Sequence, residues 1–143
     1  MKRKIKTFII LALIIVVLCT LLYYFRERPI GYGADTVNLE YLRVNRVTDE
    51  SESDVTEWID PIMLIEMLSK TQSRRAINTM GSYHMSDIRW EIDLIDSEQG
   101  PYHVVLGKNS FWYVSGDEWF NIAEADVLID NIDALYEQGI DSI

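Results

Sequence analysis

The sequence predicts an α+β protein, in which an N-terminal transmembrane helix precedes a small antiparallel sheet covered by two helices. Three observations lead to this fold class. An uncharged run of nineteen residues, 7–25, follows a basic start. Apolar residues recur at helical spacing over 61–70 and again after residue 123. Between those segments, short alternating runs are separated by glycine-containing turns, which is typical of a β-meander.

The uncharged run is long enough to cross a lipid bilayer. At ~1.5 Å per residue, a helix of this length covers about 28 Å, close to the thickness of the hydrocarbon layer. Four bases precede the run and two follow it, so the positive-inside rule predicts a cytoplasmic N-terminus and an extracytoplasmic remainder. The bilayer is therefore an expected partner. The residues expected to form the membrane anchor include Phe8, Leu11, Ile14, Val17, Leu21, Tyr23 and Tyr24.

A cleaved secretory signal and a lipoprotein signal are the alternatives to an anchor. Cleavage requires small residues at the end of the apolar run, whereas this run ends with Leu21-Leu22-Tyr23-Tyr24-Phe25. Cys19 lacks the small preceding residue of a lipoprotein box. As the only cysteine of the chain, it has no partner for an intrachain disulfide, so the hydrophobic core must hold the domain together.

Charge divides the chain into two unlike parts. Residues 1–28 carry six bases and one acid, whereas residues 29–143 carry seven bases and twenty-two acids, a net charge of −15. The predicted organisation is a basic N-terminus and anchor (1–28), a short stalk (29–35) and one extracytoplasmic α+β domain (36–143). The remainder after the anchor is too short for a multidomain enzyme. Its negative charge argues against nucleic acid as a partner and favours cationic ones.

The first half of the domain contains one predicted strand and one predicted helix. Alternation over 36–47 predicts a strand with a bulge, and the polar run 49–54 predicts a solvated loop. Asp60-Pro61 is a strong helix start that leads into an apolar face, from Ile62 to Leu68. Residues 71–83 are expected to form an irregular connection.

The second half predicts a meander followed by a helix. Strands are expected over 86–96, 102–106 and 110–115, with a short fourth strand through Trp119 and Phe120. A helix from about Ala123 is expected to stop at Gly139. Its predicted apolar stripe includes Val127, Leu128, Ile132, Leu135 and Tyr136, and its predicted water-facing residues are Asp126, Asp130 and Asp133.

No motif indicates catalysis, a metal or a cofactor. His84 and His103 have acids nearby, including Asp87, but neither lies in a ligand-spacing motif. Ser110 lies in a predicted hairpin without an evident base. We therefore expect surface or turn histidines, no metal site, no cofactor and no enzymatic activity.

Aromatic and basic residues are the candidates for partner binding. Alternation places Phe111 and Tyr113 on one face of a strand and Trp112 on the other, so one set must point away from the core. An exposed Trp112 with its neighbour Trp119 would suit a sugar ring or a peptide, although core packing is the simpler role. The local basic pair Arg74-Arg75 suits an acidic partner, or snorkels over the first helix of the domain.

The layout resembles a known class of proteins. A basic start, a single apolar anchor and an α+β domain with Thr71-Gln72-Ser73-Arg74-Arg75 after a short amphipathic helix is similar to small membrane-anchored extracytoplasmic proteins of Gram-positive bacteria. The domains of those proteins have no assigned function. The resemblance implies a bacterial cell-envelope location and no catalytic residue.

Three functional hypotheses follow from these observations. The first is a non-enzymatic domain that binds or senses an envelope protein or a peptide through the meander and the Arg74-Arg75 segment. The second is an envelope hydrolase or metal-dependent enzyme that uses a histidine with a carboxylate. The third is an immunity or inhibitor protein that presents its acidic face to a cationic toxin.

Overall fold

Eight strands form a single antiparallel sheet in the computed structural model of the chain, which describes residues 2–76, 87–114 and 118–142. The strands follow the spatial order β1-β4-β8-β7-β6-β5-β2-β3. Their bounds are β1 Arg28–Pro29, β2 Leu39–Val47, β3 Glu52–Asp54, β4 Gln72–Arg75, β5 Ile88–Asp96, β6 Gly100–Gly107, β7 Phe111–Val114 and β8 Trp119–Ile122.

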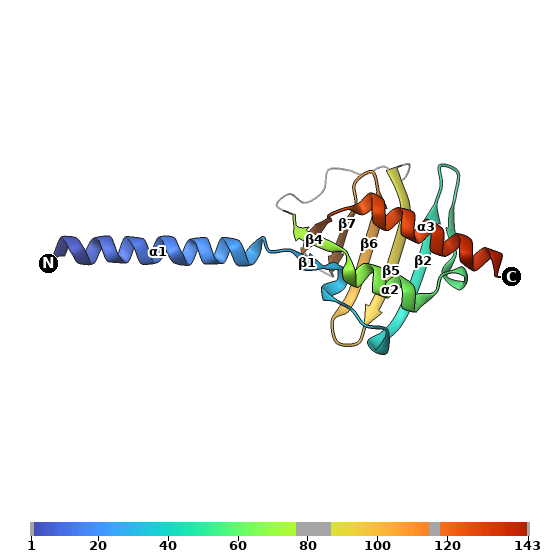
Figure 1. The fold of residues 1–143 in the computed structure, drawn as a ribbon, viewed down its shortest axis with the longest axis horizontal. Coiled ribbons are helices and arrows are strands. Elements are labelled where there is room, and N and C mark those ends of the chain that lie inside the picture. Colours follow the sequence, from blue (N-terminus) through green and yellow to red (C-terminus); the bar gives the residue numbers. More distant parts are fainter. Residues whose placement is uncertain (1, 77–86, 115–117, 143) are drawn as a thin grey trace.

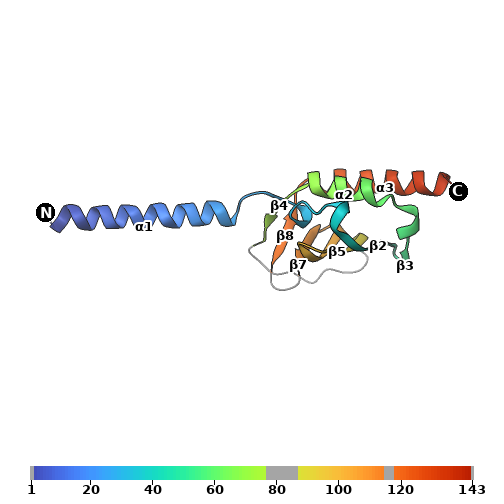
Figure 2. The same cartoon turned by 90° about the horizontal axis from the view of Figure 1, so that it is seen from below.

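Three α-helices accompany the sheet in the described part of the chain: α1 Lys2–Tyr24, α2 Pro61–Lys70 and α3 Ala125–Asp141. Helix α1 projects away from the rest of the protein, whereas α2 and α3 lie side by side over one face of the sheet (Figures 1 and 2). This arrangement confirms the predicted α+β fold, with two helices on one side of an antiparallel sheet.

The predicted start of the first domain helix is confirmed. The side chain of Asp60 accepts hydrogen bonds from the backbone N–H groups of Ile62 (2.8 Å) and Met63 (3.2 Å). Pro61 occupies the first turn, where its missing N–H costs no hydrogen bond. The buried face of α2 consists of Leu64, Ile65 and Leu68, while Ile62, which was expected on the apolar face, is exposed.

The predicted meander is also confirmed, because β5, β6, β7 and β8 pair in sequence order. The β5–β6 turn pairs Asp96 with Gly100, and the strands then run in register as far as Trp90. The bulge expected in the first strand is present, as the pairing of β2 with β5 shifts between Leu39 and Tyr41. These hairpins build the centre of the sheet from neighbouring segments of the chain.

The segment predicted to be a stalk, 29–35, is instead part of the folded domain. Its first residue, Pro29, belongs to β1, which pairs with β4. The backbone N–H of Ile30 donates to Thr71 O (3.1 Å), and the Ile30 side chain is buried in the main core. The ring of Tyr32 packs edge-on against Trp112. Apolar side chains beside the glycines give this segment more favourable contacts in the core than in solvent.

Two further segments that we expected to be irregular contain strands. Within the polar run 49–54, β3 pairs with the end of β2, and within 71–83, β4 pairs with β1 and β8. Strand pairing uses backbone groups, so polar residues at the edge of a sheet form strands without an apolar pattern. Residues 77–83 of the predicted connection lie outside the described residues.

The last helix extends beyond its predicted stop at Gly139 to Asp141. Gly139 serves close packing: an added Cβ atom would lie 1.8 Å from the carbonyl oxygen of Trp58, in the 3-10 helix η3 (Thr56–Trp58). The buried face of α3 also differs from the predicted one. Val127 is exposed, whereas Asp133 packs inward, accepts a hydrogen bond from Trp90 Nε1 (3.0 Å) and pairs with Arg89.

Helix α1 contains the expected membrane-spanning run. Its segment Ile5–Tyr24 comprises 20 residues with a mean hydropathy of 2.9, and no part of it is buried against the domain. By length and composition this segment suffices to cross a bilayer. A signal sequence near the N-terminus also satisfies these criteria of length and composition, so they alone leave both the anchor and the signal open.

The close approach at Gly139 gives a stability prediction. Replacing Gly139 by Ala forces the Trp58 carbonyl away from α3, and we expect a loss of about 1–3 kcal/mol in the free energy of unfolding. Urea denaturation of the full chain in detergent, followed by tryptophan fluorescence, measures this loss. The control is Gln138→Ala, an exposed neighbour in the same helix, which should leave the midpoint nearly unchanged. An unchanged midpoint for Gly139→Ala would show that η3 does not pack on α3 as described.

Candidate functional site

The face of the sheet opposite α2 and α3 is the candidate site, and we call it the open face (Figure 2). Strand register shows which residues lie on the open face, because side chains alternate between the two faces along a strand and cross-strand partners lie on the same face. A first row across the sheet consists of Arg43, Asp93, His103, Tyr113 and Trp119. A second row consists of Asp54, Asn45, Glu91, Val105 and Phe111.

His103 and Asp93 form the most specific contact on this face. They are cross-strand partners in β5 and β6, and His103 Nδ1 contacts the carboxylate of Asp93. The ring of Tyr113 lies 5.0 Å from the imidazole, measured between ring centroids. The pair lines a shallow depression in the surface. The lining residues are Tyr41, Asp93, Leu94, Ile95, Pro101, Tyr102, His103 and Tyr113.

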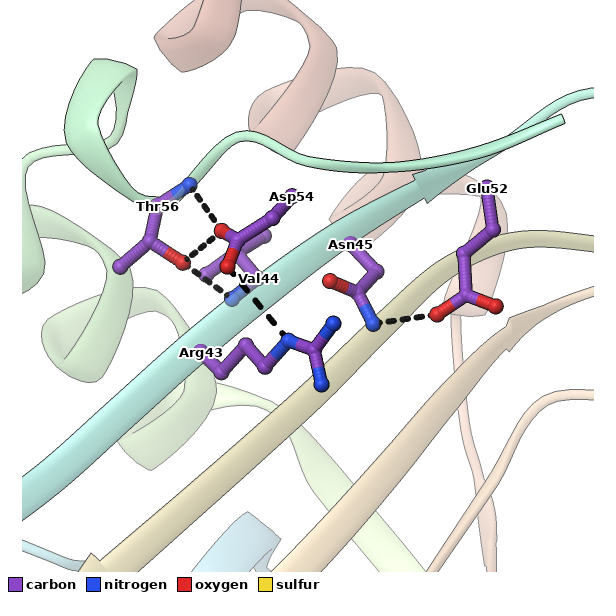
Figure 3. Close-up of polar contacts among 6 residues, drawn as sticks. All are labelled: Arg43, Val44, Asn45, Glu52, Asp54 and Thr56. Carbon is purple, nitrogen blue, oxygen red and sulfur yellow. Dashed lines mark hydrogen bonds and ion pairs between the residues drawn. The ribbon is translucent and has the colours of Figure 1, made fainter.

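Carboxylates gather on the neighbouring strands. Glu91 is half-buried, and burial raises the pKa of its carboxyl above the ordinary value of 4.5, with the nearby charges of Glu52 and Asp93 adding to the shift. Asn45, which is buried, donates its side-chain amide to Glu52 (Figure 3). The other atom of that amide, Oδ1, is buried without a hydrogen-bond partner among the described residues.

Asp54 has a structural role at the edge of this cluster (Figure 3). Its carboxylate accepts from Thr56 Oγ1 (2.6 Å) and from the Thr56 backbone N–H (3.0 Å). Those hydrogen bonds are the main reason that the pKa of Asp54 lies below its usual value. Thr56 Oγ1 in turn accepts from the N–H of buried Val44 (2.8 Å). Thr56 therefore links β2 to the turn after β3 and holds Asp54 charged beside Arg43.

Aromatic rings occupy the other half of the open face. The ring of Trp119 lies 4.2 Å from Tyr113 and 5.4 Å from Phe111, measured between centroids. Together with Val47, Ile88 and Val105 they form a second apolar cluster, separate from the main core. Trp119, one of the predicted partner-binding residues, is half-buried here.

Trp112, a candidate partner-binding residue if it were exposed, does not belong to this face. It is fully buried in the main core, where its ring stacks on Phe120 at a centroid distance of 4.2 Å. Its Nε1 donates to the hydroxyl of buried Ser73 (2.8 Å). As predicted, Trp112 lies on the opposite face of β7 from Phe111 and Tyr113, and its face is the one that the helices cover. Trp112 therefore stabilises the fold and is unavailable to a partner.

Arg74 and Arg75 lie neither on the open face nor in the core, but at the junction between α1 and the domain. Arg74 Nε donates to Glu27 (3.1 Å), in the short segment that follows α1. Arg75 pairs with Glu118, and its guanidinium lies 4.3 Å from the ring centroid of Tyr24. The four predicted partner-binding residues therefore do not form one site. They divide between the junction, the core and the open face.

The His103–Asp93 pair was not found by sequence reasoning, which paired the histidines with nearby acids such as Asp87. The register of the β5–β6 hairpin could have predicted this pair from the sequence. A turn that pairs residues 96 and 100 also pairs 93 with 103, since both pairs sum to 196. His84 lies outside the described residues. Within the described ranges, no group of three or more His, Cys, Asp or Glu side chains is placed to hold a metal ion.

Burial of Glu91 gives a prediction on pH dependence. A folded-state pKa raised above 4.5 means that the folded protein loses stability as pH rises from 4.5 through the raised value. Above that value, folding moves a charged carboxylate into a partly desolvated position. Replacing Glu91 by Gln should raise stability at neutral pH by less than about 1 kcal/mol, since the half-exposed group keeps much of its hydration. The gain should vanish well below pH 4.5.

Urea midpoints of the full chain in detergent at both pH values measure this difference. Glu137→Gln, on the exposed side of α3, is the control and should show no such pH-dependent gain. A Glu91→Gln variant that is less stable than the parent at neutral pH would contradict the assignment of Glu91 to a desolvated position.

Comparisons with known proteins place the chain in no family. No protein-family model, no curated protein and no solved structure matches it. The resemblance to membrane-anchored proteins of Gram-positive bacteria thus stays a prediction based on layout. The site to be explained is the open face, with its carboxylates, its His103–Asp93 pair and its aromatic cluster.

Proposed function

We propose that the chain is a single-pass membrane protein whose extracytoplasmic domain binds a cationic peptide or protein segment on the open face. The apolar run in α1 supports the anchor, and the excess of bases before it supports a cytoplasmic N-terminus. The bulky end of the run disfavours cleavage. The acidic domain would then face the exterior of a bacterial cell.

The observation that carries the binding proposal is the charge of the open face. Four carboxylates gather there on adjacent strands: Glu52, Asp54, Glu91 and Asp93. Their negative charge is partly balanced by Arg43, which forms an ion pair with Asp54 (3.5 Å). The pKa of the Glu91 carboxyl is raised mainly by burial, and the neighbouring carboxylates Glu52 and Asp93 add to the shift while His103 and Arg43 oppose it. A basic side chain from a partner would balance the remaining negative charge.

The depression beside the carboxylates suits a short peptide. Pro101, Ile95 and the exposed ring of Tyr41 line it together with the His103–Asp93 pair. Apolar walls next to charged groups provide both contact area and orientation for a side chain such as lysine or arginine. A cationic toxin that an immunity protein neutralises would be one partner of this class.

An enzyme is the second candidate, and the His103–Asp93 contact favours it. A carboxylate that orients an imidazole is the arrangement of a general base. Within the part of the chain that the structure describes, however, Asp93 is the only side chain in hydrogen-bond contact with the His103 imidazole. The binding function accounts for the acidic strands as well as for the pair, so we prefer it.

Topology is the first test of this proposal. An alkaline phosphatase fused to the C-terminus should be active in intact bacteria, because that enzyme folds only outside the cytoplasm. A β-galactosidase fusion at the same position should be inactive. The reverse pattern, or release of a soluble fusion without α1, would contradict an anchored extracytoplasmic domain.

Binding can be tested by photo-crosslinking in cells. A benzophenone side chain at Tyr41, beside the depression, should crosslink to a partner, whereas one at exposed Val127 on α3 should not. Reversing charge on the open face with Glu52→Lys and Asp93→Lys should abolish the crosslink. The matched control, Asp126→Lys with Asp130→Lys, changes the net charge equally on the exposed surface of α3 and should preserve it.

The same assay separates the two candidate functions. His103→Gln removes the imidazole but leaves the carboxylates of the open face in place, so the crosslink at Tyr41 should persist if binding depends on those carboxylates. A crosslink that is lost in His103→Gln but kept in the single variant Glu52→Lys, which leaves the His103–Asp93 pair intact, would favour the enzyme instead.

A further inference from the structure

Four arginines surround the point where α1 joins the domain: Arg26, Arg28, Arg74 and Arg75. We call this group the arginine collar. It is assembled from two distant parts of the chain, because β1 pairs with β4 and brings Arg28 opposite Ser73. Figure 1 shows β1 and β4 at the end of the domain that is nearest to α1.

Aromatic rings hold three of these side chains in place. The Arg26 guanidinium lies 4.7 Å from the ring centroid of Tyr23, and Arg75 lies 4.3 Å from that of Tyr24. Arg28 lies between rings from the helix and the domain, 5.6 Å from Tyr23 and 5.9 Å from Phe120. The contacts of Arg75 and Arg28 link the end of α1 to the domain, whereas that of Arg26 lies within the end of the helix itself.

The depth of the collar follows from the length of the span. The 20 residues of Ile5–Tyr24 cover about 30 Å as a helix, which equals the thickness of the hydrocarbon layer. Tyr24 therefore lies at the boundary between hydrocarbon and headgroups. The headgroup layer extends roughly 5–8 Å further outward on each side, so the Arg75 guanidinium, 4.3 Å from the Tyr24 ring, lies within that layer.

The charge of the collar is only partly compensated within the protein. Glu27 pairs with Arg74 and Glu118 pairs with Arg75, which leaves a net charge of +2 from four bases and two acids. A lipid phosphate offers the negative charge that would balance this excess and oxygens that accept hydrogen bonds from exposed guanidinium groups.

We propose that the arginine collar binds the phosphates of lipid headgroups, so that the domain is docked on the membrane surface. The proposal depends on the membrane anchor proposed above, but it does not depend on which side the domain faces. Without the four collar arginines and their partners Glu27 and Glu118, the remaining residues of 29–143 carry a net charge of −16, because Arg74, Arg75 and Glu118 contribute +1 to the total of −15. An anionic membrane attracts the collar and repels this remainder, which orients the domain with its acidic surfaces away from the lipid.

Amide hydrogen exchange of the full chain tests the docking. The chain is placed either in an uncharged maltoside detergent or in nanodiscs of equimolar phosphatidylglycerol and phosphatidylcholine. We expect several-fold slower exchange of the β1 and β4 amides in the nanodiscs. In Arg26→Gln with Arg74→Gln, two exposed positions, this lipid-dependent slowing should be lost. The control Arg43→Gln with Arg46→Gln removes the same charge from β2 and should keep it.

Equal exchange of β1 and β4 in detergent and in nanodiscs would overturn the proposal, as would a slowing that the collar variant retains. Slowing by inorganic phosphate alone in detergent would also overturn it, in favour of a site for a free anion. The amides of α1 distinguish this failure from failure of the anchor. If α1 is protected in the nanodisc while β4 shows no lipid dependence, only the docking is wrong. If α1 is unprotected, the anchor itself is wrong.

Discussion

One constraint organises the domain: the central strands of its single sheet, β2, β5, β6, β7 and β8, present one face to the core beneath α2 and α3 and the other face away from it. The covered face contains the largest buried side chains, Trp90, Trp112 and Phe120. Because side chains alternate along each strand, burying those rings also determines which residues lie opposite. His103, Asp93 and Glu91 are therefore brought together on the open face by the packing of a core to which they do not belong.

Polar contacts inside the covered side secure the ends of the chain to this sheet. The buried hydroxyl of Ser73 accepts from Trp112 Nε1 and donates to the carbonyl of Arg28, each at 2.8 Å. It thereby joins β7, β4 and β1, which come from three separate parts of the sequence. Asp133 has a similar role for α3, through its hydrogen bond with Trp90. Satisfying buried donors and acceptors in this way makes the pairing of distant strands specific.

The same pairing gives the protein two surfaces of opposite charge. The β1–β4 pair gathers arginines against the last aromatic residues of α1, while the β2–β3 and β2–β5 pairs gather carboxylates on the open face. Both surfaces are consistent with a protein that is held at a membrane by its basic end and meets a basic partner with its acidic face. The two proposals are therefore physically compatible, although they depend on different residues.

The sequence by itself determined the elements that have a local signal. The apolar run of α1, the Asp60-Pro61 start of α2 and the alternation of β5 are visible because each depends on neighbouring residues. It did not determine β3 or β4, whose polar residues form strands through backbone pairing with distant segments. Only the tertiary structure decided that Trp112 is buried, that His103 meets Asp93, and that Arg74 and Arg75 meet the end of α1. Those outcomes depend on strand register and on which face the helices cover, and both are set by contacts between residues far apart in the chain.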